Sequence, residues 1–157
     1  MMEMVWFPDI MSHIHEVPFA CGCCMAVEKN TFDKIGKFDS GIQIWGVEDA
    51  EICLRAWLLG YRVLCEPSIK VGHMFRDKHP YDVQWADVLY NQVRLAFSHF
   101  KPERLIKCLS AMVQLPNFDK ACSNVFESDI LNRRKELFSK RVRSDDWFFG
   151  RFPMNDY

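Results

Sequence analysis

The sequence predicts an α/β fold over residues 17–100, followed by a helical extension over residues 101–157. Two observations support this prediction. Pro18–Val27 is a continuous apolar run of strand length, bounded by a proline and by polar residues. Beyond Pro80, apolar residues recur at helical spacing, as they do in amphipathic helices. Residues 1–16 are then an N-terminal segment, which we expect to be truncated from a longer chain.

The first expected elements are a strand and a short helix. A strand over Pro18–Val27 would be buried on both faces, as strands of α/β sheets usually are. Asn30 or Thr31 then caps a helical turn over Phe32–Ile35, which ends at Gly36.

A second helix and two further strands complete the α/β region. The helix covers Ala50–Leu59 and has Gly60 as its C-terminal cap. Tyr61–Glu66 alternates as a strand does, and another strand ends at His73. Glu51 and Arg55, four residues apart, should form a helix-face ion pair of modest value.

Three helices are expected after Pro80. The first runs from Val83 to Phe100, the second begins at Pro102, and the third runs from Ser128 to about Val142. The apolar stripe of the second helix consists of Leu105, Ile106, Leu109 and Met112.

Composition excludes some classes of protein. The 157 residues suffice for one ordinary domain, and the net charge of −1 argues against a general nucleic-acid binder. No apolar run approaches the roughly 20 residues that cross a bilayer, and residues 1–10 lack the pattern of a secretory signal. The seven cysteines are odd in number and irregularly spaced, which favours reduced thiols and a cytoplasmic protein.

Three of these cysteines form the cluster Cys21-Gly22-Cys23-Cys24. Thiolates bind zinc well, so a metal site is one interpretation. No second ligand pair follows at suitable spacing, and a buried strand of small residues is the favoured alternative.

Two segments carry the functional signal. Trp45-Gly46-Val47-Glu48-Asp49-Ala50-Glu51 places three acids at the start of a helix, and Val71-Gly72-His73-Met74-Phe75-Arg76 ends a strand on an imidazole. Acids fixed at a helix start can remove a proton, and a histidine can hold a divalent cation. An ordinary helix start and a strand-end histidine bonded to a carbonyl are the alternative interpretations.

These segments resemble the acceptor-side, C-terminal half of nucleotide-sugar glycosyltransferases. The polypeptide N-acetylgalactosaminyltransferases carry W-G-G-E-N-x-E and V-G-H-V-F-R, whereas galactosyltransferases and bacterial family 2 enzymes carry W-G-x-E-D. The resemblance implies a partial A-type glycosyltransferase fold and a nucleotide-sugar donor, with UDP as the expected nucleotide. It also implies a glycan or other hydroxyl acceptor.

The resemblance assigns roles to individual residues. Asp49 is the expected general base, and Glu48 is expected to hold sugar hydroxyls. His73 would be one ligand of a Mn²⁺ or Mg²⁺ ion, with Arg76 near the diphosphate. The remaining substrate contacts fall on Gly22, Trp45, Gly46 and Tyr81; Trp45 could equally fill the core.

The residue at position 49 bears on the stereochemistry of transfer. The retaining N-acetylgalactosaminyltransferases have Asn where this chain has Asp49, and Gly where it has Val47. The Glu-Asp pair is the pattern of inverting enzymes, so we expect inversion of the anomeric configuration.

The family's nucleotide-binding half, with its Asp-x-Asp or Asp-x-His ligands, has no counterpart in this sequence. We therefore expect the isolated chain to be inactive, unless two copies build a shared site. The alternative function is a non-catalytic carbohydrate-binding or scaffolding remnant. A third hypothesis is peripheral binding to a membrane through the cations of segment 133–143.

Overall fold

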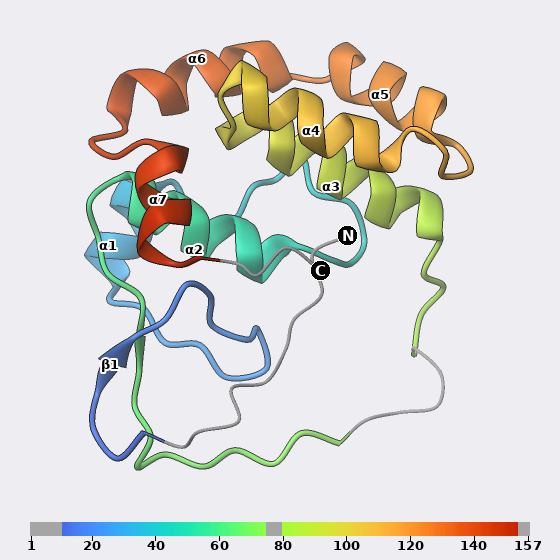
Figure 1. Ribbon diagram of the computed structural model, residues 1–157. Helices are drawn as coiled ribbons and strands as arrows, with labels where there is room; N and C mark the ends of the chain where they lie inside the picture. The colour runs from blue at the N-terminus through green and yellow to red at the C-terminus, as the bar shows by residue number, and fades with distance from the viewer. Residues whose placement is uncertain (1–10, 75–79, 154–157) are drawn as a thin grey trace.

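The computed structural model describes residues 11–74 and 80–153. Within these ranges the helices gather in one body, and a short β-ribbon with a long loop projects from it (Figure 1). The elements in chain order are β1 (His15–Glu16), α1 (Lys29–Ile35), α2 (Glu48–Leu58), β2 (Leu64–Cys65), α3 (Trp85–His99), α4 (Pro102–Met112), α5 (Phe118–Glu127), α6 (Ile130–Lys140) and α7 (Asp145–Arg151).

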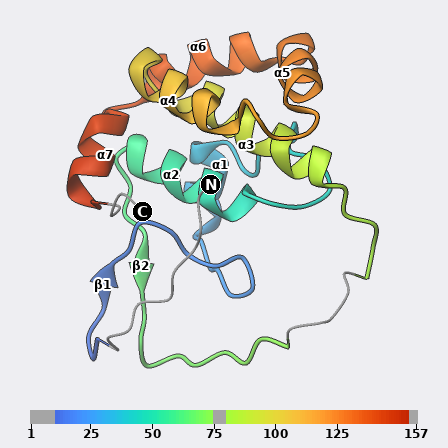
Figure 2. The ribbon, with the colours of Figure 1, turned by 45° about the vertical axis from the view of Figure 1, so that its right-hand side comes forward.

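The β-ribbon is antiparallel and very short. His15 pairs with Cys65 and Glu16 with Leu64, so β1 and β2 run side by side (Figure 2). The Val17 amide donates to the Val63 carbonyl at 3.0 Å and extends the contact by one residue. Two paired residues per strand do not define the strand order of a larger sheet, so the A-type fold stays a prediction.

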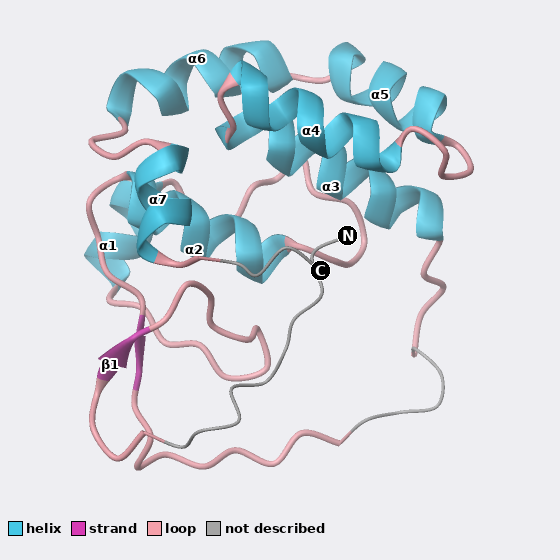
Figure 3. Cartoon of the chain, viewed as in Figure 1, coloured by secondary structure: helices cyan, strands magenta, loops and turns pink. Residues whose placement is uncertain are grey.

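The structure does not form two of the three expected strands, and the third strand is much shorter than expected. Pro18–Val27 is loop and turn, Tyr61–Glu66 contributes only Leu64–Cys65, and the segment up to Met74 is loop (Figure 3). The physical reason is one-sided burial. Phe19, Ala20 and Met25 pack against α2, whereas Cys23, Cys24 and Val27 are exposed, and no neighbouring described strand covers them.

The helix boundaries follow the sequence signals more closely. α1 begins three residues earlier than expected because Glu28, rather than Asn30 or Thr31, accepts from the backbone amides of the first turn. Gly36 and Gly60 both adopt positive φ, at 92° and 95°, and end α1 and α2 as predicted. The two helices α5 and α7 were not expected.

The helices beyond residue 101 share cores with the helices before it. α3 supplies one side of a first cluster, whose other side comes from α4, α5 and α6. A second cluster joins α2, α3 and α7; its buried members are Leu54, Trp57, Leu58, Leu95, Ala96, Phe100 and Phe148. Helix α3 thus lies between the α2 region and the C-terminal helices.

A buried ionic network also links these helices. Glu51 and Arg55 of α2 pair at 2.7 Å, and both side chains are buried. Helix α3 contributes His99, whose Nε2 lies 2.9 Å from the Glu51 carboxylate, and α6 contributes Arg133 at 2.8 Å. The Glu51–Arg55 pair was predicted correctly, but it is internal, so removing one partner would leave an uncompensated buried charge.

Most cations of segment 133–143 serve internal contacts. Arg134 donates to the carbonyls of Phe97 and Phe100, and Arg143 donates to those of Trp57 and Tyr61. These guanidinium groups therefore help to hold the helices together, and peripheral binding to a membrane stays a prediction. Of the helices within the described ranges, none combines the length and apolarity needed to cross a bilayer.

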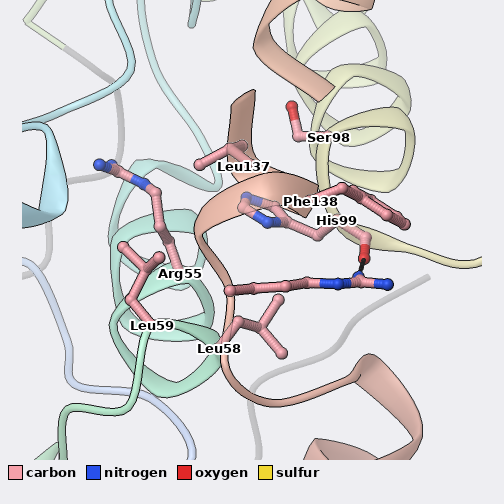
Figure 4. Close-up of a pocket in the computed structure, with 8 residues that line it drawn as sticks. Arg55, Leu58, Leu59, Ser98, His99, Leu137 and Phe138 are labelled. Atoms are coloured by element: carbon pink, nitrogen blue, oxygen red, sulfur yellow. Dashed lines mark hydrogen bonds between the residues drawn. The ribbon is translucent and has the colours of Figure 1, made fainter. Parts of the chain in front are cut away.

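A small cavity of about 10 Å³ lies where α2, α3 and α6 meet. Figure 4 shows the His99 ring of α3 between Leu137 of α6 and Leu58 of α2, with the Ser98 hydroxyl directed away from Leu58 and a guanidinium bonded to the His99 carbonyl. The Ser98 hydroxyl is buried without a protein partner. This volume can hold one water molecule and no larger ligand. We therefore treat the cavity as a packing gap between the helices and not as a binding site.

Candidate functional site

A larger cavity of about 580 Å³ opens beside the N-terminus of α2. Its walls come from the loop at residues 22–27, from α1 and from the first two turns of α2. Gly22, Glu48 and Asp49 all line it, so three of the predicted site residues meet at one cavity. The volume lies within the range of small-molecule sites.

The carboxylate of Asp49 is held at the start of α2. Its Oδ2 accepts from the Gly22 amide at 3.1 Å, and its Oδ1 accepts from the Ala50 amide at 2.7 Å. A Cβ on residue 22 would lie 3.6 Å from Oδ2, in ordinary contact, so glycine is not required there by space alone. The two amides fix the carboxylate while leaving it at the cavity wall.

Glu48 is fixed by the loop that precedes it. Its Oε2 accepts from the Gly46 amide at 2.7 Å. Both acids occupy the first turn of α2, where the helix dipole favours negative charge. Glu48 and Asp49 are therefore oriented by backbone donors rather than by other side chains, and their remaining lone pairs can receive hydrogen bonds from a ligand.

The loop before α2 has an unusual backbone. Ile44, Gly46 and Val47 have φ values of 42°, 103° and 65°, in the left-handed region that β-branched residues rarely enter. Glycine at position 46 fits this conformation without cost. Val47 is nevertheless the N-cap residue of α2, and its side chain makes no capping bond.

Asn91 of α3 holds this loop in place, and the sequence analysis missed it. The side chain is fully buried; its amide nitrogen donates to the carbonyls of Gln43, Trp45 and Gly46 at 2.8, 3.1 and 3.2 Å. Its oxygen accepts from the Gln43 amide at 2.8 Å. The available signal was a polar residue inside the apolar face of the helix expected over Val83–Phe100.

The other predicted site residues lie away from the cavity walls. Trp45 is half-buried in the loop that Asn91 holds, and Gly46 is buried against Val88. His73 and Tyr81 are exposed in the loop between β2 and α3, and neither lines the cavity. Arg76 lies outside the described residues.

The described residues do not form a complete metal site. Across residues 11–74 and 80–153, no three His, Cys, Asp or Glu side chains converge in a way that could hold an ion. Among these described residues, Cys21, Cys23 and Cys24 do not form such a cluster. All seven cysteines are free, and burial raises the pKa of Cys53 to about 11. The buried-strand alternative for this segment is wrong, since Cys23 and Cys24 are exposed.

Comparison with known proteins bears on this site. A family profile for the "N-terminal domain of galactosyltransferase" matches residues 11–80, which include the cavity and its carboxylates. Residues 11–80 are therefore glycosyltransferase-like. The profile's description does not place the match in a C-terminal half, so that position stays a prediction.

Individual relatives agree with the profile. The chain is 42% identical over 81 residues to "Probable N-acetylgalactosaminyltransferase 8" of Caenorhabditis elegans, covering 50% of this chain. It is 35% identical over 91 residues to "Polypeptide N-acetylgalactosaminyltransferase 11" of Xenopus tropicalis, covering 57% of this chain. The matches span 19% and 15% of those two proteins, respectively.

Proposed function

We propose that this chain is the acceptor-side part of a glycosyltransferase that moves a sugar from a nucleotide-diphosphate donor, with UDP as the favoured nucleotide, to a hydroxyl acceptor. The observation that carries the proposal is the position of Asp49. Its carboxylate lies at the wall of the 580 Å³ cavity and is oriented by the Gly22 and Ala50 amides. The glycosyltransferase likeness of residues 11–80 supplies the reaction class.

In this proposal Asp49 is the general base. The acceptor oxygen attacks the anomeric carbon, the bond from that carbon to the diphosphate oxygen breaks, and the acceptor proton passes to Asp49. Glu48 orients hydroxyl groups beside it, because its carboxylate is fixed by the Gly46 amide. Direct displacement inverts the anomeric configuration, so we expect an inverting enzyme.

The departing diphosphate needs positive charge, which Mn²⁺ or Mg²⁺ commonly supplies. His73 is the residue that we propose as a ligand, with further ligands from outside the described residues. Arg76 is proposed as a fixed cation for the same group. No step assigned to Asp49 or Glu48 depends on the ion.

The proposal is tested by Asp49→Asn in the intact protein that carries this sequence. Asparagine keeps the shape and can orient a hydroxyl, but it cannot accept the proton. We expect kcat for sugar transfer to fall about 100-fold or more, with little change in donor binding. Asp33→Asn is the matched control, because Asp33 is an exposed acid of α1 that pairs with Lys37 on the surface and does not line the cavity.

Near-normal turnover of Asp49→Asn, or a product that keeps the donor's anomeric configuration, would overturn the base assignment. The 157-residue chain alone should show no turnover of a nucleotide sugar. The alternative, a non-catalytic carbohydrate-binding module, predicts binding of glycans by the chain and no transfer by the intact protein.

A further inference from the structure

The cavity beside Asp49 has a wall that its proposed chemistry does not use. Besides Gly22 and the charged residues, the lining consists of the apolar side chains Met25, Val27, Phe32, Phe38 and Ile52. Phe38 is 51% exposed and Val27 is 44% exposed, although each is large and apolar. Exposed apolar side chains gathered in a concavity mark a binding surface more often than scattered ones do.

The two phenyl rings are arranged for a third apolar group. Phe32 and Phe38 pack edge to face, with ring centroids 5.6 Å apart and planes at 69°. In this arrangement the edge of one ring contacts the face of the other, and about half of the Phe38 side chain stays exposed. A ring or branched alkyl group placed there would bury the open part of Phe38.

The lining of the cavity combines charged and apolar groups. Five of the nine lining residues carry apolar side chains, and the charged groups are Glu48 and Asp49 at the start of α2 and Lys29 on α1. A glycan carrying hydroxyls on every side would place several of them against apolar carbon, where an unpaired polar group costs free energy. A ligand that carries both a hydroxyl and an apolar group can contact the carboxylates and the apolar side chains together.

We propose that the cavity is an acceptor subsite for hydroxyl compounds that carry an aryl or branched alkyl group. The hydroxyl end lies at Asp49 and Glu48, and the apolar group packs on Phe38, Phe32 and Val27. The assignment rests on the proposed function for the role of Asp49. It adds a chemical class of acceptor that the motif does not specify, whereas the name of the Xenopus relative gives a polypeptide as the acceptor of that relative.

The test uses two probes and two matched variants of the 157-residue chain. Binding of phenyl β-D-glucopyranoside and methyl β-D-glucopyranoside is measured by calorimetry and by saturation-transfer NMR. Phe38→Ala removes the open ring of the cavity. Phe126→Ala is the control, because Phe126 is also 51% exposed and packs edge to face on another ring, but it lies on α5.

We expect the phenyl glycoside to bind more tightly than the methyl glycoside, with saturation transferred mainly to its aromatic protons. Phe38→Ala should weaken phenyl glycoside binding about 5- to 10-fold and leave the methyl glycoside unchanged, while Phe126→Ala changes neither. Equal affinity for the two probes, no detectable binding at millimolar concentration, or an aryl preference that survives Phe38→Ala would overturn the subsite.

The outcomes separate this inference from the proposed function. If Asp49→Asn abolishes transfer but the aryl preference does not depend on Phe38, the subsite is wrong and the transferase assignment stands. If the preference depends on Phe38 while Asp49→Asn transfers normally, the apolar subsite stands and the base assignment falls.

Discussion

Val47 shows at the scale of one residue how the loop before α2 is strained. Its φ of 65° places a β-branched side chain in the left-handed region, which costs L-residues roughly 1–2 kcal/mol. The side chain is partly buried against the cluster of α2, α3 and α7, which offsets some of this cost. The conformation aims the first turn of α2, and with it Glu48 and Asp49, at the cavity.

Comparing Val47→Gly with Val47→Ala probes the backbone strain, because both variants lose the two Cγ methyl groups and they differ in packing by the Cβ alone. Glycine relieves the left-handed strain, although it adds entropy to the unfolded chain. We expect Val47→Gly to be more stable than Val47→Ala by about 0.5–1 kcal/mol, measured by urea unfolding.

The matched pair is Lys135→Gly and Lys135→Ala, in an exposed position inside α6. There glycine should be the less stable variant, by about 1 kcal/mol. If the alanine variant were the more stable one at both positions, residue 47 would not have a left-handed backbone in solution.

At the scale of elements, α3 fixes the loop that starts α2. Asn91 makes four hydrogen bonds to backbone groups of Gln43, Trp45 and Gly46 across the interface between the two helices. Buried polar groups are costly unless every one is paired, and here a single side chain pairs several backbone groups at once. The orientation of the candidate base thus depends on a residue 42 positions later in the chain.

Asn91→Leu keeps the approximate volume but leaves the Gln43 amide and nearby carbonyls without partners. We expect the free energy of unfolding to fall by about 2 kcal/mol or more, and the amides of residues 43–46 to exchange faster with solvent. Calorimetry and hydrogen exchange measure the two effects.

Asn132→Leu on α6 is the control, since Asn132 is exposed and the substitution should change stability by less than about 0.5 kcal/mol. Unchanged protection of the loop amides in Asn91→Leu would contradict the role given to Asn91.

For the whole molecule, buried charges join the glycosyltransferase-like region to the C-terminal helices. Arg94 of α3 pairs with Asp39 at 2.9 Å and with Asp129 at 2.8 Å, and Arg133 of α6 reaches both Asp39 and Glu51. Gly41 lies against this network, because a Cβ there would stand 2.2 Å from the Arg94 guanidinium carbon. Residues 101–157 therefore complete the charge balance of α2 and α3.

The network makes stability depend on pH. Burial, together with the charges of Arg55 and Arg133, lowers the pKa of His99 despite its bond to Glu51. Burial alone would raise the pKa of Glu51, but the bond from His99 and the charge of Arg55 outweigh it and hold that pKa well below its usual value. The folded protein therefore binds fewer protons than the unfolded chain in the acid range.

With both folded pKa values lowered, stability is fully present above the unfolded pKa and is lost as the pH falls. The His99 contribution should begin to disappear below about pH 6.5, and that of Glu51 below about pH 4.3. Urea unfolding at a series of pH values measures the slope of the free energy of unfolding against pH.

His99→Gln keeps a donor for Glu51 but does not titrate, so it should flatten the slope between about pH 6.5 and 5. Asn132→Gln, at an exposed position of α6 that does not titrate, is the control and should leave the slope as in the parent chain. A parent chain whose stability does not change over this interval would contradict the burial of His99.

The sequence by itself determined α1 to α4 and α6, but not α5 or α7, and it determined the identity of the acids at the candidate site. Gly36 and Gly60 ended their helices as predicted, because a left-handed terminal residue is a local property that glycine satisfies alone. The helical spacing after Pro80 placed α3 and α4 within a few residues. Gly22, Glu48 and Asp49 could be assigned to one site because the motif specifies their chemistry.

Only the tertiary structure decided what is buried and what each side chain contacts. Pro18–Val27 reads as a buried strand, but a strand needs a hydrogen-bonded partner along at least one edge and a strand of this composition needs cover on both faces. Within the described residues this run packs on α2 from one side only. Asn91, His99 and Arg133 lie far from Glu51 and the loop before α2 in sequence, so no local pattern reveals their bonds. The apolar wall at Phe32 and Phe38 likewise exists only where α1 folds beside the start of α2, since the cavity is made by their packing.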